Sequence, residues 1–389
     1  MSDPKAATPA SWAAFRALVP VTNRWAYFDN AAVAPLPETS RAAILRWASE
    51  ATEEGDTAWP QWLQRGVKVR RLAAQILNAA DDEIAIINNT THGITLVAEG
   101  FPWQEGDNIV TLENEFPSNL YPWMNLASYG VEVRRLPVEE GRVDLEKIAA
   151  ACDARTRLIT VSWVGYALGW RLDVGKLVQM AHDRDVLVFL DAIQGLGVFP
   201  LDVQATGVDF LAADGHKWML GPEGAGIFYV RKEHLNTLRP IGVGWNSVVQ
   251  GADFGHIDLN LRPDAARYEG GSQNLVGMIG LAASLQTLID FGLTPQSSPI
   301  AERVLEVTDY ACQRLAAIGA DVASCRESGH RSGIVAFSPP AGDPVEVRRR
   351  CLDNGVVLSL RGGWLRISPH AYCNEDDVDR MIAVLQSTS

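Results

Sequence analysis

One lysine stands where a side-chain amine could take part in chemistry. The chain contains six lysines among its 34 basic residues: Lys5, Lys68, Lys147, Lys176, Lys217 and Lys232. Lys217 follows the apolar run Val208–Ala213 and the tripeptide Asp214-Gly215-His216, and Trp218 comes next. Burying a lysine is unfavourable unless its amine is paired or used chemically. The alternative is an amine that reaches solvent past Trp218.

A carboxylate occupies a similar position in Val186–Gln194. Asp191 follows five consecutive apolar residues, and Gln194 comes three residues later. An uncompensated carboxylate is unfavourable at the end of a buried strand, so Asp191 needs a cation or a protonated ring nitrogen. Capping of the next turn is the weaker alternative, because the preceding strand has the pattern of a fully buried one.

A third polar group lies at Asn88–His92, NNTTH, where a predicted strand ends and a predicted helix begins. Free backbone amides and the dipole of a helix N-terminus bind anions. N-capping by Thr90 or Thr91 alone is the commoner meaning of such a pair.

The three groups together fit one cofactor. Ligands of open parallel sheets bind beyond the carboxyl ends of the strands, and each group follows a predicted strand. Pyridoxal 5′-phosphate needs an anion site for its phosphate, a lysine for the aldimine and an acid beside its pyridinium nitrogen. Thr90-Thr91, Lys217 and Asp191 meet these needs in turn, so the sequence predicts a pyridoxal-phosphate site.

An alternation of strands and helices must position these residues. Helices are predicted from apolar spacing over Pro37–Thr52, Gln61–Ala79, His92–Glu99 and Asp173–Arg184. Strands are predicted over Glu83–Ile87, Asn108–Leu112, Val131–Leu136, Arg157–Ser162, Val186–Leu190, Val208–Ala213 and Gly226–Val230. Because several strands are continuous apolar runs, we expect a seven-stranded, mainly parallel sheet covered on both faces.

The pattern changes after about residue 235. A glycine-rich loop leads to a helix over Leu275–Phe291, and a smaller α+β region follows the linker Thr294–Pro299. This region is predicted to contain the helices Ala301–Ile318, Pro344–Asn354 and Glu375–Gln386 and the strands Gly333–Phe337, Val356–Ser359 and Trp364–Ser368. We therefore predict a large α/β domain over residues 21–265 and a small domain formed by 1–20 and 266–389.

Composition excludes several classes of function. The net charge of −13 and the lack of a basic tail make a nucleic-acid or anionic-membrane partner unexpected. Five dispersed cysteines without a CxxC pair suggest reduced thiols in a cytoplasmic protein, and Met1–Pro20 lacks the pattern of a signal peptide. The seven histidines show no metal-ligand spacing. A dinucleotide dehydrogenase is disfavoured because no GxGxxG opens a helix after an early strand.

The motifs resemble those of a known family from about Tyr27 to Arg380. Thr90-Thr91, the Asp191–Gln194 segment DAIQ, and Gly215–Gly226, GHKWMLGPEGAG, are similar to class V aminotransferases. That group of fold-type I enzymes includes cysteine desulfurases, kynureninase and isopenicillin N epimerase-like proteins. The resemblance implies Lys217 as the Schiff-base lysine, Asp191 as the partner of the ring nitrogen and Gln194 as the partner of the ring hydroxyl.

Further cofactor contacts are implied by the same resemblance. Thr91 and His216 would hold the phosphate. Phe116 would stack on the cofactor ring, at a position where desulfurases usually carry histidine. Asp214 stands near the phosphate where many relatives have serine or threonine. An acid there would repel the phosphate unless it turns away or pairs with a cation.

Substrate and subunit contacts are implied as well. Arg366, in the segment Trp364–His370, would bind the substrate α-carboxylate, since guanidinium binds carboxylates bidentately. Strand alternation places it opposite to its apolar neighbours, so a solvated Arg366 stays the alternative. Asn119 and Arg361 are further candidates for substrate contact. Ser272 resembles the residue that reaches the phosphate of a neighbouring subunit, which predicts a homodimer with a shared active site.

One departure from the family pattern bears on the reaction. Desulfurases carry a nucleophilic cysteine on a loop shortly before the carboxylate-binding arginine, whereas Leu358–Trp364 contains none. Cys351 lies in a predicted helix and Cys373 comes after Arg366, so neither replaces it. A persulfide mechanism is therefore not expected.

These expectations combine into one functional prediction. The chain is predicted to be a class V aminotransferase-like enzyme that acts on a free α-amino acid through an external aldimine, with Lys217 removing the α-proton. Transamination or a C–S lyase-type β-elimination is favoured over epimerisation or racemisation. A pyridoxal-phosphate-binding homologue without catalysis is the non-enzyme alternative, and Arg366 argues against it.

Overall fold

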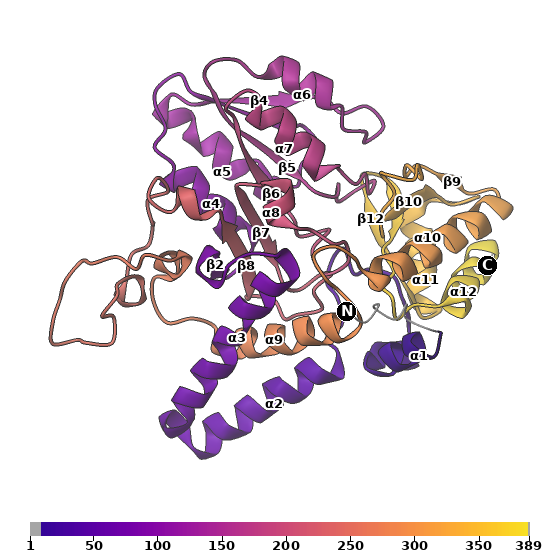
Figure 1. Ribbon diagram of the computed structural model, residues 1–389. Helices are drawn as coiled ribbons and strands as arrows, with labels where there is room; N and C mark the ends of the chain where they lie inside the picture. Colours follow the sequence, from indigo (N-terminus) through magenta and orange to yellow (C-terminus); the bar gives the residue numbers. More distant parts are fainter. Residues whose placement is uncertain (1–8, 388–389) are drawn as a thin grey trace.

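A seven-stranded sheet forms the centre of the larger part of the molecule (Figure 1). The fold is known from a computed structural model, which describes residues 9–387. The strands run in the order β2-β8-β7-β6-β5-β3-β4, and all pairs are parallel except those that β8 makes. Their bounds are β2 Ile84–Ile87, β3 Asn108–Leu112, β4 Glu132–Leu136, β5 Thr156–Ser162, β6 Leu187–Asp191, β7 Phe210–Asp214 and β8 Gly226–Val230. The predicted α/β fold with a mainly parallel sheet is confirmed.

The continuous apolar strands are buried on both faces. In β6, Val188 and Leu190 belong to one hydrophobic cluster and Phe189 belongs to another, as expected when successive side chains point to opposite faces. Helix α7 (Val174–His182) contributes to the first cluster, and α4 (Thr90–Gly100) contributes to the second. The sheet is thus a rigid middle layer whose strand ends can hold side chains in fixed positions.

Three long helices pack together beside the sheet. Helix α9 (Leu275–Asp290) lies against α2 (Glu38–Glu53) and α3 (Trp59–Leu77), as Figure 1 shows. Helix α9 therefore contacts the large α/β part, although the predicted domain boundary at residue 266 assigns it to the smaller one. No helix within residues 9–387 is long and apolar enough to cross a membrane.

A second, four-stranded sheet organises the C-terminal part. Its order is β12-β13-β10-β9, with β9 Asp321–Val322, β10 Val335–Ser338, β12 Ser359–Arg361 and β13 Trp364–Ile367. The helices of this part are α10 (Pro299–Ala317), α11 (Pro344–Asp353) and α12 (Glu375–Gln386), which lie together in Figure 1 with α1 (Pro9–Ala17) close by. Arg16 of α1 pairs with Asp377 of α12 at 2.5 Å.

Short elements account for most differences from the sequence prediction. The predicted strand Val356–Ser359 divides into β11 (Val356–Val357), which pairs in parallel with β1 (Ala26–Tyr27), and β12, which joins the four-stranded sheet. Strand pairing across more than 300 residues leaves no local signal. The one-turn helices α5 (Tyr121–Met124) and α8 (Val203–Thr206) and the helix α6 (Leu145–Ala151) were also not predicted, although Asp144 caps α6.

Candidate active site

The ends of two adjacent strands build the floor of a pocket of about 350 Å³. Asp191 is the last residue of β6 and Asp214 the last of β7, and these parallel neighbours end at the same edge of the sheet. Lys217 follows three residues after Asp214, is only 9% exposed and lines the same pocket. The structure therefore brings the predicted lysine and the predicted carboxylate together.

Close packing brings the start of α4 to this edge. A Cβ at Gly93 would lie 2.5 Å from the Cβ of Ala212 in β7, so only glycine allows the helix to approach so near. The side chain of Asn89 caps α4 by accepting a hydrogen bond from the backbone N–H of His92 at 2.8 Å. Thr90 Oγ1 accepts from the Asp214 N–H at 3.0 Å, while Thr91 is exposed and lines the pocket. The helix N-terminus is thus directed at the pocket, which suits an anion.

Asp191 has the surroundings expected of a partner for a protonated ring. It is 2% exposed, and among the described residues only the backbone N–H of Ile193 donates to its carboxylate, at 3.0 Å. Burial raises the pKa of Asp191 to about 6, and the nearby charge of Lys217 partly opposes the rise. A buried carboxylate with so few donors is stabilised by a cationic hydrogen-bond donor in the pocket.

The amine of Lys217 is likewise shifted by its surroundings. Burial lowers the pKa of Lys217 to about 8, and Asp191 works against this shift. Its Nζ lies 5.6 Å from the ring centroid of Phe116, which is 43% exposed at the mouth of the pocket. The rings of Phe116 and Tyr166 pack edge to face, with their centroids 5.3 Å apart. An amine that loses its proton near neutral pH can act as a nucleophile and as a base.

Gln194 also lines the pocket, held by two hydrogen bonds. Its Oε1 accepts from Trp218 Nε1 at 2.8 Å, and its Nε2 donates to the Ala31 carbonyl at 3.0 Å. A primary amide carries two N–H groups, so one remains for a ligand. Trp218 is itself buried, and the tryptophan beside Lys217 thus helps to orient Gln194.

Asp214 lines the same pocket, and its carboxylate contacts the two residues that follow it in the chain. Its Oδ1 accepts from the Gly215 N–H at 2.7 Å, and its Oδ2 lies 2.9 Å from Nδ1 of His216. This contact lacks hydrogen-bond geometry, and Nδ1 of His216 has no hydrogen-bond partner among the described residues. The Asp214 carboxylate thus contacts the loop that follows β7.

Arg366 reaches the pocket from the smaller sheet. It is 1% exposed, and it donates to the Tyr166 carbonyl at 2.6 Å, to Ser359 Oγ at 3.1 Å and to Asp29 at 3.2 Å. Burial lowers its pKa to about 10, and Asp29 opposes this shift. The solvated alternative does not hold, and Arg361 lines the same pocket.

Asn119 lies apart from the pocket, in contrast to the expectation that it contacts substrate. Its side chain is fully buried, donating to Glu115 and accepting from Trp123 Nε1 at 3.0 Å and from Thr160 Oγ1 at 2.7 Å. Glu115, which the sequence analysis did not single out, also accepts from the backbone N–H of Ser162 at 2.8 Å and from its hydroxyl. Burial raises the pKa of Glu115 to about 7. This network fixes the segment that carries Phe116.

Replacing Glu115 with alanine should destabilise the protein by about 1–3 kcal/mol, because the buried amide of Asn119 and the partly buried donors of Ser162 would lose their acceptor. Urea unfolding measures the change. Glu113→Ala is the matched control, since this glutamate is exposed and should alter the free energy of unfolding by less than about 0.5 kcal/mol. Equal stability of the two variants would contradict a supporting role for Glu115.

Ser272 is exposed and is not among the residues that line the pocket of its own subunit. Its proposed contact with a second subunit stays a prediction.

No cysteine lines the pocket among the described residues. The connection between β12 and β13 is a two-residue turn, Gly362-Gly363, with φ of 57° and 84° at the two glycines. Two consecutive positive φ values suit glycine, and a turn this tight leaves no loop to carry a nucleophile. Cys351 and Cys373 are buried elsewhere, and burial raises the pKa of both thiols. The missing thiol is therefore a property of the fold as well as of the sequence.

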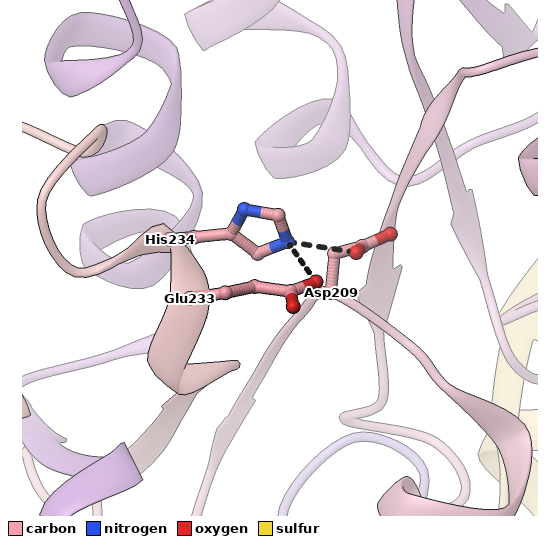
Figure 2. Close-up of side chains that lie close together, drawn as sticks. All are labelled: Asp209, Glu233 and His234. Carbon is pink, nitrogen blue, oxygen red and sulfur yellow. Dashed lines mark hydrogen bonds and ion pairs between the residues drawn. The ribbon is translucent and has the colours of Figure 1, made fainter.

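A separate cluster lies at the opposite end of β7. Asp209, Glu233 and His234 bring three potential metal-ligand atoms within 4.8 Å of one another (Figure 2). The Asp209 carboxylate already has Nε2 of His182 and of His234 at 2.9 and 2.8 Å, and it accepts from the Val188 N–H at 2.8 Å. These contacts tie the start of β7 to α7 and to the 3₁₀ helix η6 (Lys232–His234), which is a structural role.

Comparisons with known proteins agree with this geometry. The family model "Aminotransferase class-V" matches residues 26–381. A probable cysteine desulfurase of Methanothermobacter thermautotrophicus is 30% identical over 391 residues, covering 95% of this chain and 96% of that protein. The apo structure of a cysteine desulfurase from Thermococcus onnurineus superposes with a TM-score of 0.85 at 25% identity, covering 99% of this chain and 98% of that one. A C-DES mutant with glycine covalently linked to its pyridoxal-phosphate cofactor shares the fold, with a TM-score of 0.87 at 23% identity over 95% of this chain and 98% of that one.

Proposed function

Because the chain belongs to the class V aminotransferase family, we propose that it is a pyridoxal-phosphate enzyme acting on a free α-amino acid. The observation that carries the proposal is a single pocket lined by Lys217, Asp191 and Arg366 at the start of α4, without a cysteine among its described lining residues. We propose transamination or a C–S lyase-type β-elimination as the reaction. Transfer of sulfur to a thiol of the protein is not supported by this pocket.

The residues present fit the cofactor. The N-terminus of α4 with Thr90 and Thr91, together with His216, would hold the phosphate. Asp191 would pair with the ring nitrogen, and the remaining N–H of Gln194 would reach the ring hydroxyl. Phe116 would lie against the ring, and Lys217 would bond to its carbonyl carbon.

When bound, pyridoxal phosphate supplies an electron sink that stabilises negative charge at the substrate α-carbon. Arg366 would bind the α-carboxylate, with Asp29 keeping the guanidinium charged and oriented until a substrate arrives. Lys217 would remove the α-proton, because its lowered pKa leaves a substantial neutral fraction near neutral pH. The ionised Asp191 would keep the ring nitrogen protonated.

The rate of covalent cofactor binding should depend on pH through Lys217. Only the neutral amine attacks a carbonyl, and the neutral fraction rises about tenfold per pH unit below the pKa. Since burial lowers that pKa to about 8, we expect the rate to rise with pH and to level off above about 8. Stopped-flow absorbance of apoprotein mixed with cofactor measures this profile. A rate that still rises up to the ordinary range of lysine would contradict the shift.

The reaction itself requires a substrate panel. Each amino acid would be assayed separately for keto acid, for ammonia and for inverted stereochemistry. Keto acid formed only with an added keto-acid acceptor indicates transamination, and keto acid with ammonia indicates elimination. Alanine formed from cysteine with sulfur bound to the protein would overturn the proposal.

Epimerisation within the same family is the second candidate reaction, and inverted product without ammonia would establish it. A non-catalytic cofactor-binding homologue would bind pyridoxal phosphate yet respond to no amino acid.

We further propose a cytoplasmic homodimer in which Ser272 reaches the phosphate of the partner. Loss of cofactor affinity in Ser272→Ala, together with a dimer in solution, would support that arrangement.

A further inference from the structure

Two arginines lie on one face of the smaller sheet, at the substrate side of the pocket. In the β12–β13 pair, Ser359 is opposite Arg366 and Arg361 is opposite Trp364. Residues two apart on a strand share a face, so Arg361 is the diagonal neighbour of Arg366. The hydrogen bond from Arg366 Nε to Ser359 Oγ confirms which face this is, and both arginines line the pocket.

The two guanidinium groups differ in their partners. Arg366 is paired with Asp29, whereas no Asp or Glu among residues 9–387 lies within ion-pair distance of Arg361. Arg361 Nη1 donates only to the carbonyl of its own neighbour, Leu360, at 2.8 Å. Its charge acts on both other cations of the pocket, since it contributes to lowering the pKa of Arg366 and of Lys217. Clustered like charges are unfavourable without an anion.

The acidic residues that line the pocket do not pair with Arg361. Asp191 and Asp214 stand at the ends of β6 and β7, and the latter lies beside His216. Glu223 is exposed in the segment after Lys217. The phosphate of the cofactor is expected at the start of α4, on the larger sheet. Among the described acids of the pocket none pairs with Arg361, so an anionic group of the substrate would compensate its charge.

We propose that Arg361 binds an anionic group on the substrate side chain, so that the enzyme acts on acidic α-amino acids. Resting on the proposed function, this assigns the α-carboxylate to Arg366 and a side-chain carboxylate, or a sulfur oxyanion of similar size, to Arg361. Guanidinium suits both groups because it forms bidentate hydrogen bonds with planar oxyanions.

Matched pairs of ligands test the proposal. The holoenzyme would be titrated with L-aspartate and L-asparagine, and with L-glutamate and L-glutamine, while cofactor absorbance is followed. Each amide has nearly the shape of its acid, so their ratio isolates the charge. A charge-assisted hydrogen bond predicts that the better-fitting acid binds about ten- to a hundredfold more tightly than its amide.

Variants test whether Arg361 causes the preference for acids over amides. Arg361→Gln should remove the ten- to hundredfold difference by weakening the acid alone, while the amount of bound cofactor stays unchanged. Arg349→Gln is the control, because Arg349 is an exposed arginine of α11 paired with Glu346 and should leave the preference intact. In a readout independent of turnover, succinate or glutarate should raise the melting temperature of the wild type more than butyrate does, and this difference should vanish in Arg361→Gln.

The outcomes separate the two proposals. If no amino acid changes the absorbance, the proposed function fails. If acids and amides bind equally well, only the acidic-substrate inference fails. Should Arg361→Gln weaken acids and amides alike, Arg361 binds the α-carboxylate, and its assignment to the substrate side chain is wrong.

Discussion

Replacing Lys217 with alanine should abolish covalent binding of the cofactor and lower turnover by about 10²- to 10⁴-fold. Among the lysines of residues 9–387, Lys217 alone lines the pocket, and a positioned base typically contributes a rate factor of this size. The purified variant, incubated with pyridoxal phosphate and passed through a desalting column, should lose the visible absorbance that the wild type keeps. The same preparation gives the residual turnover number.

Lys232→Ala is the matched control for this experiment. Lys232 is exposed and paired with Asp82 at 2.5 Å, so its loss removes a lysine without touching the pocket. We expect the control to keep the visible absorbance and the wild-type rate. A Lys217→Ala protein that still retains bound cofactor after desalting, with the wild-type spectrum, would contradict the assignment.

Replacing Asp191 with asparagine should lower the turnover number by about 10²- to 10³-fold, in the range seen when one preorganised electrostatic partner is removed. Asparagine keeps the shape and can still accept from the Ile193 N–H, but it cannot hold a proton on a ring nitrogen. Cofactor should still bind through Lys217, so the loss should fall on the turnover number rather than on the amount of bound cofactor. Steady-state kinetics with absorbance-based cofactor quantitation separate the two.

Asp209→Asn distinguishes this effect from the loss of any buried strand carboxylate. Asp209 is as buried as Asp191 and lies next to β7, but at the end of that strand away from the pocket. Its replacement should lower the melting temperature, since His182, His234 and the Val188 N–H depend on it, and leave turnover unchanged at permissive temperature. Equal rate losses in the two variants would contradict a specific role for Asp191.

The larger sheet could be predicted from the sequence because its signals are local. Strands buried on both faces have continuous apolar sequences, which are easily recognised. The structure gives β3 and β8 the predicted bounds. Polar residues that follow such runs stand out, which is how Asp191 and Lys217 were found. Their proximity then follows from the rule that parallel strands end at one edge, and β6 and β7 are neighbours in the sheet.

The remaining site contacts depend on residues far apart in the chain. Asp29 pairs with Arg366 across 337 residues, and nothing near either residue indicates the pair. Asn119 was expected at the substrate because of the segment it belongs to, yet its burial depends on Glu115 and Thr160. A polar residue in such a short helical segment has the same local pattern whether it faces a pocket or a buried network.

Orientation is a further property that spacing did not reveal. Asp214 was identified from the sequence as an acid close to an expected phosphate, with no partner apparent. Its rotation toward the Gly215 N–H and His216 depends on the backbone path after β7. The position of Arg361 beside Arg366 also could not be read from spacing. It depends on the register of β12 and β13, which makes the two arginines diagonal neighbours.

The most direct test of the central claim is to locate the cofactor on the chain. Holoenzyme would be reduced with borohydride, which fixes the cofactor to its amine, and then digested and analysed by peptide mass spectrometry. We expect the added mass on the peptide containing Lys217, with the peptides of the other lysines unmodified. Cofactor mass on a different lysine, or on none, would contradict the identification of this pocket as a pyridoxal-phosphate active site.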